Sequence, residues 1–481
     1  MRFSALRRAP IWAIALLLLV PALAAAQDGD AEISTAINTI WVVLAAILVL
    51  FMQAGFAMLE TGLSRMKNAG AVMAKVLMNL SIALVMFWAI GFAIAFGDGS
   101  SLIGSTGWFM PNDELAGTFS VYDGLGLPIE ALFLFQIGFV AVSLAIVSGA
   151  MLDRTKFIGY VIFAVFFAGV IYPFVAHWTW GGGWLFERGF LDFAGSSIVH
   201  LQGALAALAG AIILGPRIGK FRNGKAVPIP GHSMPLAVLG VFILFIGWAG
   251  FNGGSGLAAI GINFGDIIMN TYLAAGAGVI GATVASLWLF KTLDVSQMGN
   301  GAIAGLVAIT APCAFVDAWA ALIIGVVAGL ILPPLVLAIE KMKIDDPVGA
   351  LPAHGVAGIW GTLAIGFFAV AERTGGAEGL LYGGGGHQLW VQFYGVAATV
   401  AFTFTASAVV FLGIKYTVGL RVSEEHELAG QDISEHGMFG YPERFIDVPG
   451  ATSDEPVHHG TVPAPAAATT KPATEPSGAT S

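Results

Sequence analysis

Long apolar stretches, separated by short polar segments, make up most of the chain. A helix needs about 20 predominantly apolar residues to cross the hydrocarbon core of a bilayer, and eleven stretches approach or exceed that length. The pattern therefore predicts an all-α integral membrane protein with eleven transmembrane helices. The expected spans are 36–60, 71–96, 130–152, 158–176, 196–214, 234–252, 267–290, 300–316, 319–339, 347–369 and 392–416.

The first 26 residues have the features of a cleavable secretory signal peptide. Three arginines precede an apolar core over residues 11–20, and a run of small residues, 24–26, ends the segment. Ten apolar residues are short for a membrane span. We therefore expect cleavage after Ala26, which places the N-terminus of the mature chain outside the cell.

Lysine and arginine are distributed unequally between the two sets of loops. If the mature chain begins outside, the outer loops hold only Arg188 and Arg373, whereas the inner loops hold eleven basic residues. This positive-inside bias predicts a multi-pass protein of the cell (inner) membrane with a cytoplasmic C-terminus. The inner set is Arg65, Lys67, Arg154, Lys156, Arg217, Lys220, Arg222, Lys225, Lys291, Lys341 and Lys343.

Composition excludes several other classes of protein. The chain is 57% hydrophobic and 11% charged, whereas a soluble domain carries roughly 25% charged residues. Its net charge of −9 says little about partners, because much of the acid lies in the C-terminal tail. The lack of a basic surface argues against nucleic acid as a partner. Cys313 is the single cysteine, so an intrachain disulfide and a cysteine zinc site are impossible.

The same polar pattern occurs twice inside apolar stretches. Asp192 is followed by a glycine three positions on and by His200 eight positions on, and Asp346 is followed in the same way by a glycine and by His354. Eight helical residues rise about 12 Å, so each aspartate is expected to cap a helix and each histidine to lie near mid-membrane. Asp192, on the outer side, would also make a cation more tolerable there. An ionisable ring at that depth indicates a substrate or ion path, with two separately satisfied core histidines as the alternative.

The repeat predicts a geometry. His200 falls in the fifth expected span and His354 in the tenth, so the chain is expected to contain two five-helix halves of inverted topology plus a final helix, with a site at their interface. An Ala-Gly-Phe sequence at 54–56 recurs at 249–251 and supports this alignment. Many glycines in the spans, such as Gly276, Gly278 and Gly329, are expected to let helices approach closely.

The histidine pair has three candidate uses: as a metal or haem ligand, as a proton relay, or as hydrogen-bonding groups for a small polar solute. A c-type haem needs two cysteines, which this chain lacks, while the spacing does not exclude a bis-histidine b-type haem. Catalytic zinc usually has three protein ligands, and no third candidate recurs with the pair. We therefore expect no cofactor, and we expect the two rings to share a hydrogen bond.

Aromatic residues gather at the expected outer ends of several spans. Phe135, Phe139 and Trp180 lie there, and Phe251 and Ser255 belong to a glycine-rich sequence at the end of the sixth span. Aromatic faces and a single hydroxyl can hold a small cation by cation–π attraction, worth about 2 kcal/mol or more when desolvated. These residues are therefore candidates for a cation-binding mouth.

Several of these motifs, together with others along the chain, resemble the ammonium transporter (Amt/Mep/Rh) family, especially its bacterial Amt branch. The resemblance extends from about residue 36 to 447. The matching stretches are FAMLETGLSRMKN (56–68), FQIGF (135–139), HWTWGGG (177–183), DFAGSSIVHLQGA (192–204), GWAGFNGGS (247–255), NGAIAGLVAITAPC (300–313), DDPVGALPAHGVAGIWG (345–361) and SEEHELAGQDISEHG (423–437).

The resemblance implies a homotrimeric transporter of ammonium or ammonia in the lipid bilayer, not an enzyme, with one narrow pore per subunit. It also implies a trimeric P-II nitrogen-signal protein as a candidate partner at the cytoplasmic face. Carried over by position, it assigns the outer ammonium site to Phe135, Phe139, Trp180 and Ser255, a gate to Phe139 and Phe251, the pore histidines to His200 and His354, and a structural role near the mouth to Asp192.

A dry pore favours transport of the neutral molecule. Moving an ion into hydrocarbon costs of order 20 kcal/mol, so we expect recognition as the cation, deprotonation, passage as ammonia and separate relay of the proton. The rival hypotheses are an ammonium sensor that signals through its tail, a channel for another small neutral solute, and a haem protein. The expected segments are the signal peptide 1–26, the membrane domain 27–416, a cytoplasmic regulatory segment 417–447 and a disordered Ala/Pro/Thr-rich tail 448–481.

Overall fold

The computed structural model describes residues 9–110 and 118–442, with side chains from residue 31 onward. The described chain is helical apart from loops and one two-stranded antiparallel hairpin. The elements are α1 (Ala9–Leu63), η1 (Met66–Asn68), α2 (Ala69–Met86), η2 (Phe87–Gly91), α3 (Phe92–Phe96), η3 (Ser120–Tyr122), α4 (Ile129–Ala150), α5 (Phe157–Phe166), η4 (Phe167–Ile171), α6 (Tyr172–Thr179), α7 (Trp184–Glu187), η5 (Ser196–Leu201), α8 (Gln202–Leu214), β1 (Phe221–Arg222), β2 (Lys225–Ala226), α9 (Met234–Gly254), α10 (Phe264–Phe290), α11 (Val295–Thr310), α12 (Ala318–Lys341), η6 (Leu351–Val356), α13 (Ala357–Phe368), α14 (Ala371–Thr374), η7 (Leu380–Tyr382), α15 (His387–Thr417), α16 (Glu424–Ala429) and α17 (Gln431–His436).

Ten helical segments among the described residues are long and apolar enough to cross a membrane. They overlap ten of the eleven expected spans, and the predominantly helical membrane architecture is thereby confirmed. The largest difference between an expected and an observed boundary is at the end of the span expected at 158–176, because the observed segment continues to Glu187. The remaining expected span, 300–316, corresponds to α11, which has 16 residues. Residues 300–310 of α11 are all buried, so this shorter helix lies inside the bundle.

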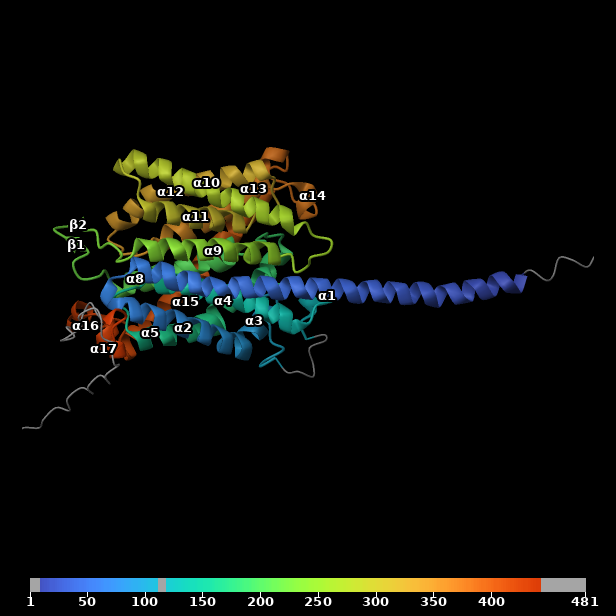
Figure 1. The fold of residues 1–481 in the computed structure, drawn as a ribbon, viewed down its shortest axis with the longest axis horizontal. Coiled ribbons are helices and arrows are strands. Elements are labelled where there is room, and N and C mark those ends of the chain that lie inside the picture. Colours follow the sequence, from blue (N-terminus) through green and yellow to red (C-terminus); the bar gives the residue numbers. More distant parts are fainter. Residues whose placement is uncertain (1–8, 111–117, 443–481) are drawn as a thin grey trace, which may run out of the picture. The chain divides into compact units, whose positions relative to one another are not determined.

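The N-terminal helix packs along the middle of the fold. Figure 1 shows α1 beside α9 and α4, and α1 contacts both of them. Helix α1 begins at Ala9 and passes through the expected cleavage point after Ala26 without a break. Residues 1–8 of the expected signal peptide lie outside the described residues, so its cleavage stays a prediction.

Close helix crossings depend on glycine, as the sequence predicts, but not at every position. A β-carbon at Gly329 of α12 would lie 2.1 Å from the carbonyl oxygen of Gly278 in α10. Such a contact is impossible, so these two glycines allow the backbones of α10 and α12 to touch. Gly276 has nothing within 4 Å of an added β-carbon, so it makes no close helix crossing with the described residues of its own subunit.

Each of the two histidines lies in a short π-helical segment, in η5 and in η6. The sequence predicts eight uninterrupted helical residues between each aspartate and its histidine, and this prediction is wrong. Gly195 has a φ of 115°, a conformation that L side chains rarely adopt, and η5 begins only at Ser196. The turn at Gly195 shortens the rise to His200. Wide π turns of this kind are frequent at functional sites.

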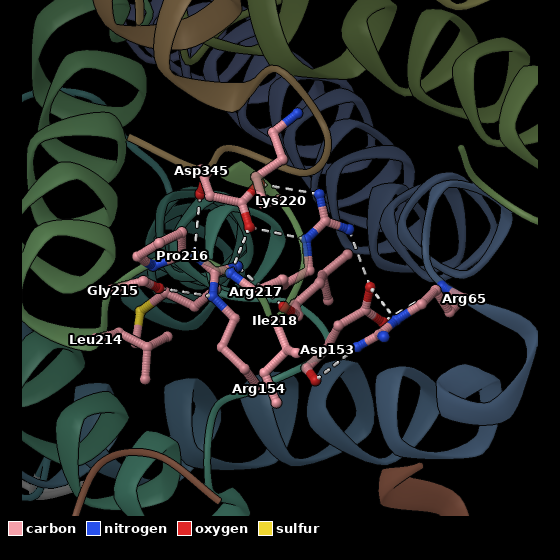
Figure 2. A network of polar contacts seen from close by, with 12 residues as sticks. Arg65, Asp153, Arg154, Leu214, Gly215, Pro216, Arg217, Ile218, Lys220 and Asp345 are labelled. Atoms are coloured by element: carbon pink, nitrogen blue, oxygen red, sulfur yellow. Dashed lines mark hydrogen bonds and ion pairs between the residues drawn. The ribbon is translucent and has the colours of Figure 1, made fainter. Parts of the chain in front are cut away.

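A buried ion-pair network joins several loops (Figure 2). It lies at the end of the bundle where α9 and α11 begin, because Arg217 lines the same space as Met234 and Ser296. The Arg217 guanidinium donates to both Asp345 carboxylate oxygens at 2.9 Å and to Asp153 Oδ2 at 3.0 Å. Asp153 also pairs with Arg65 at 3.3 Å. Burial alone would raise the pKa of Asp345, but the hydrogen bonds from Arg217 and the charge of Arg154 hold this pKa at about 2.

The described part of the C-terminal segment is attached to the same end of the fold. Asp432 in α17 accepts hydrogen bonds from the backbone N–H groups of Gly70 and Ala71, at 3.0 and 2.8 Å. Glu427 in α16 accepts from the backbone N–H of Ile218 at 2.7 Å and pairs with Arg421. The first part of the expected segment 417–447 is therefore docked, whereas residues 443–447 and the expected tail 448–481 lie outside the described residues.

Candidate functional site

A pocket at one end of the bundle brings the candidate mouth residues together. Phe135 and Phe139 belong to α4, Trp180 follows α6, and Ser255 follows α9. The pocket has a volume of about 270 Å³. Its lining is Phe96, Val121, Tyr122, Leu125, Phe135, Gln136, Phe139, Trp180, Phe186, Phe193, Ser255 and Leu257.

The orientation of the pocket side chains is fixed by contacts with their neighbours. The Trp180 indole N–H donates to the carbonyl oxygen of Asp192 at 2.8 Å, and the Ser255 hydroxyl donates to the carbonyl oxygen of Phe251 at 2.7 Å. The ring centroids of Phe135 and Phe139 lie 4.7 Å apart. Since the Ser255 oxygen keeps its lone pairs while its hydrogen is engaged, it can accept a hydrogen bond from a guest in the pocket.

Two phenylalanine rings lie between the pocket and the histidine pair. The centroids of Phe139 and Phe251 are 4.3 Å apart, and both side chains are essentially inaccessible to solvent. Phe139 lines the pocket whereas Phe251 does not. The pair expected to form a gate is therefore in contact, and it separates the pocket from the histidines.

The two histidine rings follow Phe251, so the pocket, the phenylalanine pair and the histidine pair form one row of side chains. The His200 ring stacks 5.4 Å from Phe251 and 5.1 Å from Trp248, and the expected contact between the histidines is present, with Nδ1 of His200 3.2 Å from Nδ1 of His354. One of these nitrogens must carry the hydrogen and the other must accept it. Each ring consequently fixes the tautomer of the other, and Nε2 is the remaining nitrogen on both.

Both aspartates of the repeat bind backbone N–H groups. Asp192 accepts four hydrogen bonds, from residues 195–198, at 2.8–3.1 Å. Asp346 accepts two, from Ala350 and Leu351, at 3.1 and 2.8 Å. Asp192 does not line the pocket. These contacts hold the starts of η5 and η6 in place, as expected of capping carboxylates.

A cavity and a vestibule lie on the side of the histidine pair that faces away from the pocket. His354 lines a small cavity that shares Asn300, Val348 and Gly349 with a larger vestibule of about 360 Å³. The vestibule lies at the opposite end of α9 from the pocket, because it contacts Met234 and the pocket contacts Ser255. The pocket, the two phenylalanines, the two histidines, the cavity and the vestibule thus follow one another from one end of the bundle to the other.

The site contains no ready metal centre in the part of the chain that the structure describes. No three His, Cys, Asp or Glu side chains lie close enough together there to hold a metal ion. The row of aromatic rings and imidazoles instead offers cation–π faces at its start and neutral hydrogen-bonding groups in its middle. Such an arrangement can bind a small cation and conduct a small neutral molecule.

Sequence reasoning missed several residues of this row, among them Trp248, Gln136 and Tyr122. Trp248 stacks on His200 and donates its indole N–H to the Thr310 hydroxyl at 2.8 Å. Gln136 and Tyr122 line the pocket, and nothing in the local pattern marks Tyr122. The sequences FQIGF and GWAGFNGGS contain Gln136 and Trp248, so these two could have been included from their motifs.

The fold and the row of site residues define a multi-pass membrane protein with a narrow path through its helical bundle. The model of the ammonium transporter family matches residues 40–441, and the chain belongs to this family. It is 41% identical over 454 residues to ammonium transporter Amt2 of Archaeoglobus fulgidus, covering 89% of this chain and 94% of the relative. It is 39% identical to ammonium transporter Amt1 of Haloferax mediterranei, covering 87% and 81%.

Solved structures agree with this assignment. A structure described as a sensor Amt protein superimposes with a TM-score of 0.77 at 36% identity, covering 84% of this chain and 99% of that one. Mep2 of Candida albicans superimposes with a TM-score of 0.74 at 29% identity, covering 81% and 87%. Both curated relatives are named ammonium transporters, and the protein is a member of a transporter family and not an enzyme, as the resemblance predicts.

Proposed function

We propose that the protein transports ammonium across the cell (inner) membrane. The pocket of Phe135, Phe139, Trp180 and Ser255 recruits the cation, which then loses a proton and passes the Phe139–Phe251 gate as ammonia. The proton travels separately through His200 and His354. The observation that carries the proposal is the unbroken row from this pocket through the two phenylalanines to the hydrogen-bonded histidines.

The proposed topology has eleven spans, with α11 as the short buried eighth span. The mature N-terminus is outside and the C-terminus is cytoplasmic, in agreement with the basic loops. Two observations support two inverted five-helix halves. Helix α1 packs against α9, which occupies the same position in the second half, and η5 and η6 are both π-helical segments preceded by an aspartate that binds their backbone N–H groups. We further propose cleavage after Ala26 and assembly as a homotrimer.

A current measurement tests transport directly. Proteoliposomes on a solid-supported membrane should give a transient current when an ammonium pulse is applied, because a cation is taken up on one side and its charge is released on the other. A potassium pulse of the same concentration should give no current, since potassium cannot lose a proton. Binding of ammonium without current or ammonia flux would favour the rival function, an ammonium sensor. The similarity to a structure described as a sensor Amt protein is the reason for testing this rival.

Changes to the mouth should affect recognition before they abolish flux. We expect Trp180→Leu and Ser255→Ala each to reduce the preference for ammonium over a neutral, methylamine-like probe at low concentration, because cation–π and hydroxyl contacts favour the charged form. The measurement is the concentration dependence of the current beside the uptake of the probe. Wild-type concentration dependence in both variants would contradict the proposed recruiting site.

The docked C-terminal segment and the vestibule form the proposed cytoplasmic face for a P-II nitrogen-signal protein. Truncation after residue 416 removes α16 and α17 together with their contacts to Asn68 and Gly70. We expect the truncated protein to lose capture of P-II protein in a pull-down from detergent. Equal capture and equal flux with and without residues 417–481 would leave the segment without this role.

A further inference from the structure

Glu60 is a buried carboxylate on the pore path that neither the aromatic mouth nor the histidine pair uses. It lies in the last turns of α1, and its side chain is 1% exposed. Its Oε2 accepts a hydrogen bond from the Ser148 hydroxyl at 2.9 Å. Its Oε1 is buried and has no hydrogen-bond partner among the described residues. An ionisable group with an unused oxygen at this depth indicates a function in moving a substrate or an ion.

The unused oxygen lies beside the cavity that begins at the histidine pair. Glu60 and His354 both line this cavity, together with Gly149 and Asn300. A β-carbon added to Gly149 would lie 2.9 Å from Val348 Cγ2 and 3.6 Å from Glu60 Oε1, so a larger residue at this position would crowd the space beside Oε1. The cavity has a volume of about 10 Å³, which is about the least that a single water molecule needs.

The cavity continues toward the vestibule. Asn300, Val348 and Gly349 line both spaces, so Glu60 lies between the histidine pair and the water of the vestibule. His354 uses Nδ1 for its contact with His200, which leaves Nε2 as the ring nitrogen that can pass a hydrogen onward. His354, one water molecule and Glu60 can therefore form a continuous hydrogen-bonded chain.

The groups around Glu60 suit a carboxyl that changes its charge. The ammonium group of Lys75, on α2, is buried and interacts electrostatically with the Glu60 carboxylate. Ser148 on α4 donates to it, and the Tyr160 hydroxyl on α5 donates elsewhere, to Asn79 at 2.9 Å. Burial favours the carboxylic acid, and the charge of Lys75 opposes it by favouring the carboxylate.

We propose that Glu60 is the proton acceptor at the inner end of the histidine pair. His354 donates one proton to the cavity water as it receives one from His200, and that water donates a proton to Glu60 Oε1. The carboxylate becomes a neutral carboxylic acid, which then releases the proton to water of the vestibule and returns to its starting state. One proton enters and one leaves, and no oxidation or reduction occurs. The inference rests on the proposed function, because it completes the separate path of the proton.

The decisive variant is Glu60→Gln, which keeps an oxygen for the Ser148 hydroxyl but cannot accept a proton. Loss of a positioned acid–base group typically costs a factor of 100 or more, so we expect an ammonium-evoked current about 100-fold lower than that of the wild type. Glu60→Asp restores the carboxylate and should recover part of the current, with a shifted dependence on internal pH. Glu372→Gln, on the exposed helix α14, is the matched control and should keep the wild-type current.

The readouts separate this inference from the proposed function. All variants are reconstituted as the full chain and checked by size exclusion, and currents are recorded in H2O and D2O over a range of internal pH. Wild-type current, pH dependence and isotope effect in Glu60→Gln would overturn the role of Glu60 alone. If Glu60→Gln does not fold, an unshifted pH dependence in Glu60→Asp overturns it equally. No current from the wild type would overturn the proposed function, and this inference with it.

Discussion

His200→Ala and His354→Ala should each abolish selective ammonium transport while leaving a folded protein. Removing one ring leaves the other buried without its Nδ1 partner, at a cost of about 1–3 kcal/mol. This cost is small against the packing of the helical bundle, so insertion and assembly should persist. The proton path through the pair is broken, however, and the current evoked by an ammonium pulse should either disappear or become a leak of potassium.

The control for this experiment is a third buried histidine. His177 contacts the carbonyl oxygens of Ala95 and Ser100 through its two ring nitrogens, and it lines neither the pocket nor the cavity. His177→Ala should therefore lower stability and keep the selectivity for ammonium over potassium. Selective currents of normal size from both pore-histidine variants would return the repeated aspartate–histidine pattern to a purely structural role.

Arg217→Met should lower the free energy of unfolding far more than the same substitution at a partly exposed arginine. Arg217 is 3% exposed and binds two carboxylates that are themselves buried. Removing one partner of a buried ion pair leaves an uncompensated charge, and the free energy of unfolding should fall by about 3–5 kcal/mol. Equilibrium unfolding in mixed micelles, with increasing mole fraction of a denaturing detergent, measures this change.

A partly exposed arginine provides the comparison. Arg373 also contacts two carboxylates, those of Asp266 and Asp317, but about a third of its side chain is exposed. Arg373→Met should cost no more than about 1 kcal/mol, because exposed ion pairs contribute little. Equal losses for Arg217→Met and Arg373→Met would show that burial does not control the energy of these networks.

Low pH should remove part of the stabilisation that the Arg217–Asp345 ion pair provides. The pKa of Asp345 is about 2 in the folded protein and about 4 in an unfolded chain. A lowered folded-state pKa contributes stability that is complete above the unfolded value and is lost as the pH falls toward the folded value. The stability that the Asp345 carboxylate contributes to the wild type should therefore be constant near neutral pH and shrink between about pH 4 and pH 2, as unfolding of the wild type over this pH range would measure.

The elements that could be predicted from the sequence are those with a local signal. A run of apolar residues indicates a span without knowledge of its neighbours, and ten of the expected spans have corresponding helices that are long and apolar enough to cross a membrane. The spacing of Asp192, Gly195 and His200 repeats that of the second half, so the two histidines could be paired from their spacing alone. The resemblance to a family then assigned the mouth residues to one site, although they lie on α4, after α6 and after α9.

The buried charges could not be predicted in this way. Arg154 and Arg217 were counted among loop residues that mark the inner side, yet both are buried. The partner of Arg217, Asp345, is 128 positions away, and no periodic pattern connects them. Glu60 stands in a motif that supports the family resemblance, but its unused oxygen is visible only when the cavity beside it is known.

The ion-pair network also has a consequence for biogenesis. Arg65, Asp153, Arg217 and Asp345 enter the network from four separate parts of the chain. During synthesis, Arg65, Asp153 and Arg217 emerge long before Asp345, so the two arginines at first have only the Asp153 carboxylate of this network between them. In the proposed topology their excess positive charge helps to hold the early helices in their orientation. Only when Asp345 is translated can Arg217 gain its second carboxylate partner and become enclosed. A nascent chain stopped before residue 345 should therefore keep Arg217 accessible to a water-soluble reagent, and a chain released after residue 440 should protect it.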